Sequence, residues 1–291
     1  MTPTEQEGGK PMTNYDEKLD EQSNIDLRQG DCLELMKDIP DKSIDMILCD
    51  LQYGTTACKW DNVIPFEPMW ERLNRIIKPN GAICLFGSEP FSSALRMSNI
   101  KNFKYDWIWN KKLAGNGILA KKQPLKIHEI VSVFHSGIYI PQMTKGKYRK
   151  KMGLKESEIT AGNSFAKQTE NDLYYPKSIL EYGIGNMRKG RLHPTQKPID
   201  LLEYLIYTYT NEGETVLDNC AGSMSTVIAC LNTKRKCIAM EKDKKYFQIG
   251  CNRVKQHILD NRIDLFYNQV YGGSVLWQNL EIELEKDTED F

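Results

Sequence analysis

The chain has 291 residues, enough for one large α/β domain or two small ones, and its 39 Lys and Arg balance 39 Asp and Glu. The zero formal net charge, taken alone, argues against a nucleic-acid partner. The mean hydropathy of −0.53, without a run of about 18 apolar residues, excludes a membrane-spanning protein. The eight scattered cysteines form no CxxC pair and residues 1–24 lack the apolar stretch of a secretory signal, so we expect a cytoplasmic protein with reduced thiols.

Apolar runs in the chain alternate between the pattern of buried strands and the pattern of helices. The strand-like runs are short and bounded by polar residues, whereas the helical runs repeat apolar residues at three- and four-residue spacing. In chain order we expect a strand, turn and helix over 24–40, a strand over 43–50, a helix over 66–79, a strand over 81–88, a helix over 90–100, and strands over 103–111 and 128–136. After an irregular stretch from 137 to 190 we expect order to return over 193–210 with a helix that starts at Pro198. A strand over 215–222 that ends in Asp218 and a turn, a helix over 225–233, a strand over 236–243 that ends in Glu241 and a helix over 245–258 follow.

This alternation of strands and helices predicts an α/β fold with a mostly parallel sheet covered on both faces. Ligands of such folds bind at the carboxyl ends of the strands. Asp50, Asp218 and Glu241 each fall at the end of an expected strand. We therefore expect these three acids to lie at one edge of the sheet.

A candidate cofactor site follows the strand that ends in Asp218. The segment TVLDNCAGSMST leads from the strand through a Gly-containing turn into a helix, whose first N–H groups are free to bind a ligand. About 20 residues further on, the next strand ends in Glu241, at the position of an acid that binds ribose hydroxyls. We interpret this arrangement as a site for an adenosine-containing cofactor. An ordinary tight strand–helix turn is the alternative interpretation.

A candidate catalytic segment, CDLQYGTTACKWD, begins at Cys49. Asp50 and the backbone carbonyl of Leu51 could accept hydrogen bonds from an exocyclic NH2 group, and Tyr53 could stack on the ring that carries it. Two such acceptors would orient the nitrogen lone pair towards an electrophilic carbon. A capping Asp and a half-buried Tyr are the alternative interpretation.

The zero net charge conceals a strong regional imbalance. Residues 1–26 carry two Lys against seven acids and residues 281–291 one Lys against six acids, a net charge of −5 at each end. Residues 101–153 carry twelve Lys and Arg against two acids, a net charge of +10. The acidic ends are typical of mobile tails, and the basic block is either a surface for a nucleic-acid backbone or a solvated loop of lysines. Of Trp107 and Trp109, we expect one in the core and the other facing DNA.

Three motifs resemble those of the S-adenosylmethionine-dependent DNA amino-methyltransferases, which methylate adenine N6 or cytosine N4, and are most similar to the phage and prophage adenine type. The family's catalytic Asp-Pro-Pro-Tyr or Asp-Leu-Pro-Tyr, with Gly-Thr-Thr and Lys-Trp-Asp after it, corresponds to DLQYGTT at 50–56 and KWD at 59–61. Its HPTQKP element stands at 193–198, and its cofactor turn corresponds to 218–226. The catalytic motif precedes the cofactor motif, as in the β-class of the family, and the resemblance covers residues 24–258.

The resemblance implies a Rossmann-like methyltransferase fold with an irregular target-recognition insertion. It divides the chain into a mobile acidic N-terminal tail (1–23), a catalytic half (24–136), a target-recognition region (137–192), a cofactor-binding half (193–260) and a C-terminal extension with an acidic tail (261–291). The implied activity is site-specific transfer of a methyl group from S-adenosylmethionine to N6 of adenine in duplex DNA, after base flipping. The expected setting is the cytoplasm of a bacterial or phage-infected cell. The resemblance leaves open a homodimer and a restriction endonuclease partner.

The resemblance also assigns residues to sites. The catalytic residues are Asp50, Leu51, Gln52 and Tyr53. The cofactor residues are Asp31, Lys197, Asp218, Asn219, Ala221, Gly222, Ser225, Thr226 and Glu241. The DNA-binding residues, taken from the basic block, are Lys111, Lys112, Lys121, Lys122, Lys145, Lys147, Arg149 and Lys150. No metal is expected, because methyl transfer does not require one and the four histidines are not at metal-ligand spacing.

The sequence departs from the family pattern at three positions. Gln52 replaces a proline that would fix the direction of the Leu51 carbonyl, Met224 replaces a glycine of the cofactor turn, and Asn219 replaces a phenylalanine. Methionine at this turn could crowd the cofactor or pack away from it. Two alternatives to an adenine methyltransferase are therefore a catalytically impaired relative that still binds DNA or cofactor, and an enzyme that acts on cytosine N4 or on RNA.

Overall fold

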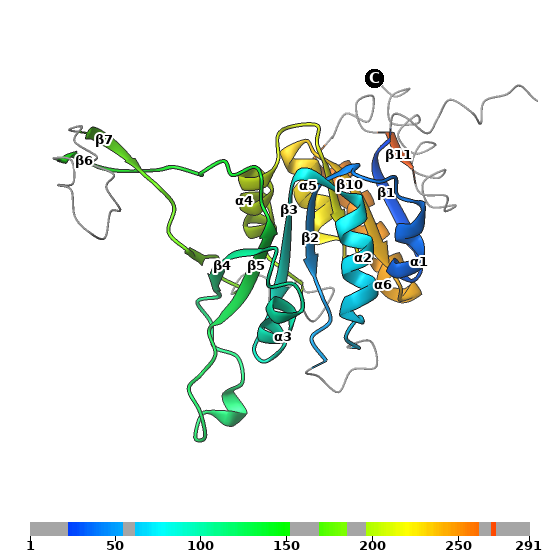
Figure 1. The fold of residues 1–291 in the computed structure, drawn as a ribbon, viewed down its shortest axis with the longest axis horizontal. Helices are drawn as coiled ribbons and strands as arrows, with labels where there is room; N and C mark the ends of the chain where they lie inside the picture. The colour runs from blue at the N-terminus through cyan, green and yellow to red at the C-terminus, as the bar shows by residue number, and fades with distance from the viewer. Residues whose placement is uncertain (1–22, 55–61, 152–168, 185–195, 262–268, 272–291) are drawn as a thin grey trace, which may run out of the picture.

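The computed structural model describes residues 23–54, 62–151, 169–184, 196–261 and 269–271 (Figure 1). The strands are β1 Ser23–Gln29, β2 Ile44–Asp50, β3 Ile77–Gly87, β4 Phe103–Asn110, β5 His128–His135, β6 Thr144–Lys151, β7 Thr169–Tyr174, β8 Ile179–Glu181, β9 Thr215–Asp218, β10 Lys236–Glu241 and β11 Gln269–Tyr271. The helices are α1 Cys32–Leu35, α2 Phe66–Ile76, α3 Phe91–Ser98, α4 Ile199–Tyr209, α5 Ser225–Thr233 and α6 Lys244–Asp260, with short 3-10 helices η1 Met36–Asp38 and η2 Gly117–Leu119.

Nine strands form one mixed sheet in the order β11-β1-β10-β9-β2-β3-β5-β4-β8, and β6 pairs with β7 in a separate two-stranded ribbon. Pairing is parallel along the order β11-β1-β10-β9-β2-β3 and between β4 and β8, whereas β5 is antiparallel to both β3 and β4. The expected α/β fold with a mostly parallel sheet is confirmed.

Helices cover both faces of the sheet because its central strands are apolar on both sides. In β2, Met46 and Leu48 pack into the core that contains α4, α5 and α6, and Ile47 and Cys49 pack into the core that contains α1, α2 and α3. Figure 1 shows these two helical layers on opposite sides of the strands. Such a strand reads as a continuous apolar run, as expected for a parallel strand buried on two faces.

The sheet changes its direction of winding between β9 and β2. The chain passes from β9 through α5 to β10 on one side, and from β2 through α2 to β3 on the other. The loops after β9 and β2 therefore diverge at the carboxyl edge, where α/β folds bind their ligands. This topology places the cofactor turn beside the catalytic motif.

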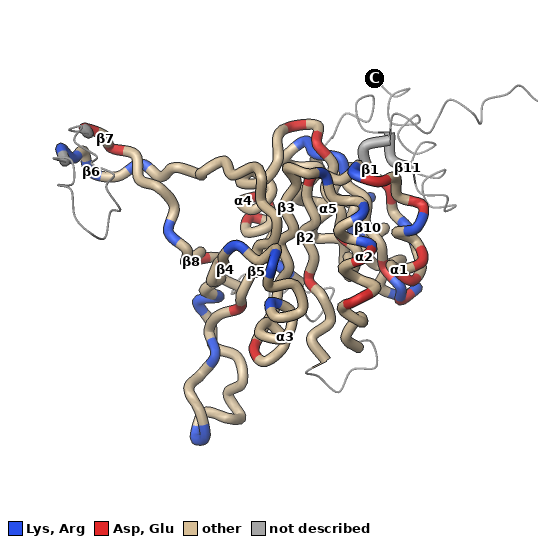
Figure 2. Tube along the Cα trace, viewed as in Figure 1, with Lys and Arg blue, Asp and Glu red and all other residues tan. Residues whose placement is uncertain are grey.

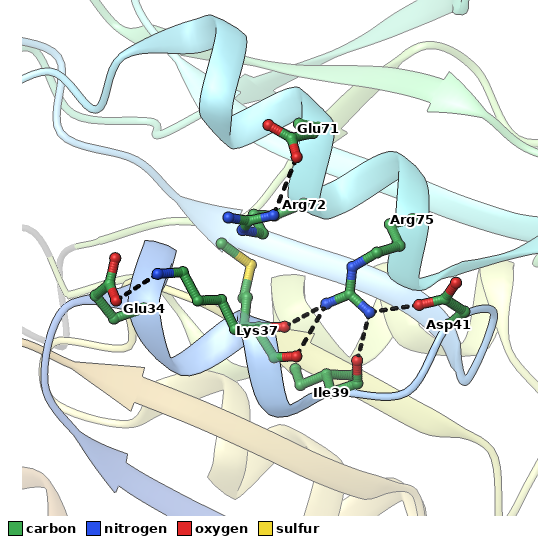
Figure 3. A network of polar contacts seen from close by, with 8 residues as sticks. Glu34, Lys37, Ile39, Asp41, Glu71, Arg72 and Arg75 are labelled. Atoms are coloured by element: carbon green, nitrogen blue, oxygen red, sulfur yellow. Dashed lines mark hydrogen bonds and ion pairs between the residues drawn. The ribbon is translucent and has the colours of Figure 1, made fainter.

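Arg75 of α2 fastens the first helical segment to the rest of that layer (Figure 3). Its Nη2 donates to the carbonyl of Met36 at 2.6 Å and its Nη1 donates to the carbonyl of Ile39 at 2.8 Å and to Asp41 Oδ1. Carbonyl groups at the end of a helix lack partners within the helix. The guanidinium supplies those partners and so positions η1 against α2.

Four sequence expectations differ from the structure. The helix expected over 66–79 ends at Ile76, and β3 starts directly at Ile77. The stretch from 137 to 190 is not wholly irregular, because β6, β7 and β8 lie within it. A short strand, β11, which pairs in parallel with β1, was not expected.

The fourth difference concerns the two tryptophans. Trp107 and Trp109 are both buried, because residues two apart in a strand lie on the same face of the sheet. Trp107 Nε1 donates to the Tyr209 hydroxyl at 2.6 Å and Trp109 Nε1 donates to the Tyr182 carbonyl at 2.7 Å. The expectation that one of them faces DNA is wrong.

Within the described ranges, no helix has the length and apolar content needed to cross a bilayer. The same part of the chain holds no cluster of His, Cys, Asp or Glu side chains that could bind a metal ion. Its seven cysteines are all free thiols, and the eighth, Cys58, lies outside these ranges.

Candidate active site

The catalytic motif starts where β2 reaches the carboxyl edge of the sheet. Asp50 is the last residue of β2, and its Oδ1 accepts a 2.7 Å hydrogen bond from the Tyr53 hydroxyl. The ring of Tyr53 stacks on Phe91 of α3, with centroids 5.2 Å apart and an interplanar angle of 28°. Leu51 is buried beneath them. The local fold therefore holds the carboxylate and the aromatic ring in a fixed relation.

Lys197 joins this motif from the segment before α4. Its ammonium forms an ion pair with Asp50 Oδ2 and lies 3.4 Å from Glu129 Oε2. Glu129 Oε1 accepts a 3.0 Å hydrogen bond from Lys111 Nζ. Four charges of alternating sign thus run from Lys111 to Asp50. The ammonium also lies over aromatic rings, 5.1 Å from the centroid of Phe86.

Burial and neighbouring charges set the protonation states of this chain of charges. Burial raises the pKa of Asp50 above its usual value, against the lowering effect of Lys197. Burial alone would lower the pKa of Lys197, but the charges of Asp50 and Glu129 outweigh it and raise that pKa. Burial alone would raise the pKa of Glu129, but the two lysines outweigh it and lower that pKa. The lysine is therefore held charged and Glu129 ionised.

The cofactor turn follows β9 and is closed by Asp218. Asp218 Oδ1 accepts from the Cys220 N–H at 3.1 Å, and Oδ2 accepts from the Thr226 hydroxyl at 2.6 Å. Burial raises the pKa of this carboxyl to about 6. Gly222 has a φ of +52°, a conformation that favours glycine, and its N–H donates to Glu241 Oε2 at 2.8 Å. Asp218 and Thr226 thus shape the turn, with Ala221 buried inside it.

Glu241 and Asp31 lie at the ends of neighbouring strands. β1 and β10 pair so that Gln29 is opposite Glu241, and the Gly30 N–H donates to the Glu241 carbonyl at 3.0 Å. Asp31 Oδ1 caps α1 by accepting from the Leu33 N–H at 2.9 Å, while its Oδ2 pairs with Lys242 at 2.9 Å. Two carboxylates therefore follow neighbouring strands at this edge, and that of Glu241 contacts the glycine turn.

Met224 occupies a left-handed conformation, with φ +60°, at the N-terminus of α5. Its side chain is fully buried and points towards α6, where a Cβ added to Gly250 would lie 2.3 Å from Met224 Cγ. The methionine thus packs into the space that Gly250 leaves. Ser225 Oγ, next along, accepts from Arg253 Nη1 at 2.8 Å.

Gln52 and Asn219 connect the catalytic motif with the cofactor turn. Gln52 Oε1 accepts from the Cys220 thiol at 3.6 Å. Asn219 Nδ2 points at sulfur atoms, 3.6 Å from Cys220 Sγ and 3.9 Å from Cys32 Sγ. Its Oδ1 is buried without a hydrogen-bond partner in the described ranges. Gln52 and Asn219, two of the positions that depart from the family pattern, therefore both contact Cys220.

The basic residues expected to bind DNA fall into three places (Figure 2). Lys111 and Lys112 lie at the sheet edge and pair with Glu129 and Glu181. Lys121 and Lys122 lie in the loop between β4 and β5. The remaining four, Lys145, Lys147, Arg149 and Lys150, lie on β6 of the ribbon that extends from the body.

The ribbon partly neutralises its own basic strand. Lys150 Nζ lies 2.7 Å from Glu170 Oε1, and Lys145 Nζ lies 3.8 Å from Asp172 Oδ2. The Arg149 guanidinium lies 3.7 Å above the ring of Tyr174. The structure thus brings the residues expected to be catalytic and cofactor-binding together but disperses the basic ones.

Two residues of the site carried no signal in the sequence. Glu129 belongs to no motif and reaches Lys197 only because β5 runs antiparallel to β3, which brings its first residues to the carboxyl edge. Phe91 reads as an ordinary apolar helix residue. Of the expected motifs, Thr55–Asp61 and His193–Thr195 lie outside the described ranges.

A family model described as a DNA methylase, of the N6/N4 type, matches residues 44–252. The chain belongs to this family. Membership of this family accounts for both the fold and the order of the motifs. The expected class of enzyme, a DNA amino-methyltransferase with S-adenosylmethionine as methyl donor, is confirmed.

Individual relatives in this DNA methylase family are distant. The chain is 25% identical to the type II methyltransferase M.HpaI of Haemophilus parainfluenzae, over 77% of this chain and 72% of that one. It is 26% identical to the DNA adenine methyltransferase YhdJ of Escherichia coli K12, over 77% of this chain and 81% of that one.

Solved structures of methyltransferases share the fold. The M1.HpyAVI–SAM complex matches with a TM-score of 0.53 and 22% identity, over 79% of this chain and 99% of that one. The PvuII DNA methyltransferase, described as cytosine-N4-specific, matches with a TM-score of 0.58 and 17% identity, over 83% of this chain and 93% of that one.

Proposed function

We propose that this DNA methylase transfers a methyl group to the exocyclic N6 amine of adenine in duplex DNA after base flipping. The observation that carries the proposal is the pair Asp50 and Tyr53, locked together by a 2.7 Å hydrogen bond at the sheet edge, one strand away from the cofactor turn. A flipped adenine has an amine to be hydrogen-bonded and a flat ring to be stacked, and this pair offers one group for each.

Asp50 and the Leu51 carbonyl would accept the two hydrogen bonds of the amine. With both N–H groups engaged, the nitrogen lone pair points out of the ring plane, in the direction from which it can attack. Tyr53, held by Phe91, would stack on the base. The proton that the amine loses after methylation would pass to Asp50 or to water, and a positioned carboxylate is a common proton acceptor in such steps.

The positive charge of Lys197 supports the same methyl-transfer step. A carboxyl as buried as Asp50 favours its neutral form, which accepts hydrogen bonds poorly. The ammonium counteracts this effect, and Glu129 with Lys111 holds the ammonium in place. We propose that Lys197 keeps Asp50 ionised, rather than binding the cofactor directly.

The residues around the turn fit S-adenosylmethionine. Asn219 has a buried amide oxygen without a hydrogen-bond partner among the described residues, and the carboxylate of Glu241 accepts from the Gly222 N–H. Asp31 follows β1, the strand that pairs with the strand of Glu241. Glu241 would bind ribose hydroxyls, and Asp31, Asn219 and the turn would hold the remaining polar groups. The bound cofactor would supply a methyl group on a positively charged sulfur.

Gln52 and Met224 are compatible with an active enzyme. Gln52 accepts from the Cys220 thiol, a side-chain contact at the position where the family has a proline, and the buried side chain of Met224 packs against Gly250 of α6. Cytosine N4 is the second candidate target, because the fold is shared with a cytosine-N4-specific enzyme. The aspartate at the start of the motif favours adenine.

We place the target-recognition function in residues 137–192, which include the ribbon. The relatives named as type II methyltransferases support a role beside a restriction endonuclease in the cytoplasm of a bacterial or phage-infected cell. A homodimer is the alternative to a monomer, and sedimentation distinguishes the two oligomeric states.

Sequencing that detects modified bases in DNA from cells expressing the chain tests this function. We expect N6-methyladenine at one short sequence motif in these cells, and none in cells expressing Asp50→Ala at the same level. Modified cytosine at the motif would select the second candidate, and unmodified DNA in both would contradict the proposal.

A further inference from the structure

The loop between β4 and β5, residues 111–127, leaves the sheet at the same edge as the catalytic motif. β5 is antiparallel to both β3 and β4, so β4 ends, and β5 begins, where β2 ends in Asp50. At its base, Lys111 belongs to the chain of charges that reaches Asp50, and Lys126 Nζ donates to Ser88 Oγ just after β3. Figure 1 shows the loop extending past α3 beyond this edge. Its position relative to the site is therefore fixed by direct contacts.

Hydrogen bonds inside the loop make it a stiff hairpin. The Lys111 N–H donates to the Ile127 carbonyl at 2.8 Å, and the Gly115 N–H donates to the Lys126 carbonyl at 2.9 Å. Asn116, in a left-handed conformation with φ +52°, accepts from the Lys126 N–H at 2.9 Å through its side chain. These bonds support the helical turn η2 at the tip.

The tip presents an apolar side chain together with two lysines. Ile118 is 99% exposed, the most exposed large apolar side chain among the described residues, and Leu119 beside it is 39% exposed. Neither Lys121 nor Lys122 forms an ion pair with any residue that the structure describes. Figure 2 shows Lys or Arg at the far end of this loop. The tip therefore differs from the ribbon, where Lys145 and Lys150 have acidic partners on β7.

An exposed apolar residue such as Ile118, close in sequence to Lys121 and Lys122, matches the chemistry of duplex DNA better than that of a protein surface. Proteins that kink or open DNA insert an apolar wedge between base pairs, while neighbouring Lys or Arg bind the phosphates. An enzyme that flips a base must also compensate for the stacking lost when the base leaves the helix. An apolar side chain placed in the vacated space supplies that compensation.

We propose that Ile118 enters the base stack of the duplex beside the flipped target, with Lys121 and Lys122 on the adjacent phosphates. The inference rests on the proposed function, because it concerns how the duplex is opened for Asp50 and Tyr53. Ile118 is a positioning residue: it touches the duplex but not the reacting amine.

The test compares Ile118→Ala with Ile100→Ala, a change of the same exposed residue type at the opposite edge of the sheet. Ile100 is 57% exposed and lies in the turn between α3 and β4. Single-turnover methylation is measured on a fully paired duplex carrying the sequence identified by base-modification sequencing, and on the same duplex with an abasic site opposite the target. Calorimetry with S-adenosylmethionine checks each variant for an intact cofactor site.

We expect Ile118→Ala to lower the rate on the paired duplex by about tenfold or more, and to approach the wild-type rate on the duplex with the abasic site, where less stacking and pairing must be broken. Ile100→Ala should match the wild type on both. An equal loss on both duplexes, or no loss, would overturn the wedge and leave the proposed function intact. A change in oligomeric state of Ile118→Ala would overturn it in favour of a contact between copies. A wild-type protein that methylates neither duplex would refute the proposed function and this inference with it.

Discussion

Asp50 and Lys197 are the two side chains whose charges depend most closely on each other. Only an ionised Asp50 accepts well from both the Tyr53 hydroxyl and the substrate amine. The rate of methyl transfer should therefore fall as the pH drops through the raised pKa of Asp50. The charge of Lys197 lowers that pKa against the effect of burial. Removing the ammonium therefore raises the pKa of Asp50 further.

Lys197→Met should move the acidic limb of the kcat/KM–pH profile to higher pH by about one unit or more, the usual effect of an opposite charge at this distance. The profile is measured by methyl transfer to duplex DNA between pH 5 and 9. Lys37→Met, which removes an exposed ion pair with Glu34, is the matched control and should leave the limb unchanged. A Lys197→Met limb at the wild-type pH would exclude the assigned role.

Asp218 should give the fold its own pH dependence. Its pKa in the folded protein, about 6, is above the value of 3.8 for a free side chain. Between these two pH values the folded protein retains a proton that the unfolded chain has lost, so the contribution of Asp218 to the free energy of unfolding falls as the pH rises from about 4 to 6.

Asp218→Asn removes this titration and should flatten the decline of unfolding free energy across that interval. Urea denaturation at pH 4, 5, 6 and 7 measures it, with Asp41→Asn, which replaces an exposed carboxylate, as the control. The same decline in wild type and Asp218→Asn would show that Asp218 does not ionise in this range.

At the scale of single residues, the sequence predicted which side chains gather but not how they pair. Asp50, Tyr53, Asp218 and Glu241 could be identified because a strand end followed by a turn leaves a local pattern. The pairing of Lys197 with Glu129 could not, because it joins the segment before α4 to the start of β5. Such contacts depend on strand order and direction, which no local pattern encodes.

The turn between β9 and α5 shows how two elements compensate for one unusual residue. Met224 stands in a left-handed conformation, which costs an L-residue about 1–2 kcal/mol relative to a right-handed one. Its buried side chain fits because Gly250 of α6 has no Cβ. The sequence identified Met224 as a departure, but the packing of its side chain depends on Gly250 of α6, 26 residues further along the chain.

A double-mutant cycle measures this compensation. Gly250→Ala should lower the free energy of unfolding by about 1–3 kcal/mol, the usual cost of overpacking a core. In a Met224→Gly background the same change should cost markedly less, since the clashing atom is gone, and interaction energies of this kind reach about 0.5–3 kcal/mol. Additive effects in urea denaturation would show that the two residues do not contact each other.

Over the whole molecule, the regional charges carry more information than their zero sum. The net charge of +10 over residues 101–153 divides in space among the sheet edge, the β4–β5 loop and β6. The two lysines of the sheet edge have acidic partners, and so do Lys145 and Lys150 of β6. Lys121 and Lys122 should therefore contribute most to phosphate contacts.

Replacing Lys121 and Lys122 by Ala should reduce the slope of log K against log salt for duplex binding by about 1.8, the value for two released counterions. Fluorescence anisotropy between 50 and 300 mM salt measures it. The control, Lys145→Ala with Lys150→Ala, removes two cations paired on β7 and should change the slope less. A larger change in the control would place the phosphate contacts on the ribbon.

The fold class followed from the sequence because buried parallel strands and amphipathic helices have distinct periods. The elements that the sequence did not predict lack such a period. β6 and β7 are polar strands that are separated along the chain, and β8 and β11 have three residues each. β6 and β7 form a ribbon outside the main sheet, and Leu180 is the one buried residue of β8, so apolar patterning gives little guidance there.

The central claim is methyl transfer to adenine by a site built on Asp50. The most direct measurement incubates the purified chain with duplex DNA and methyl-labelled S-adenosylmethionine, then identifies the labelled nucleoside by mass spectrometry. The account predicts labelled N6-methyladenine with the wild type, and none with a folded, cofactor-binding Asp50→Asn. A folded wild-type protein that binds the cofactor and labels no adenine, or an Asp50→Asn variant that labels it at the wild-type rate, would contradict the claim.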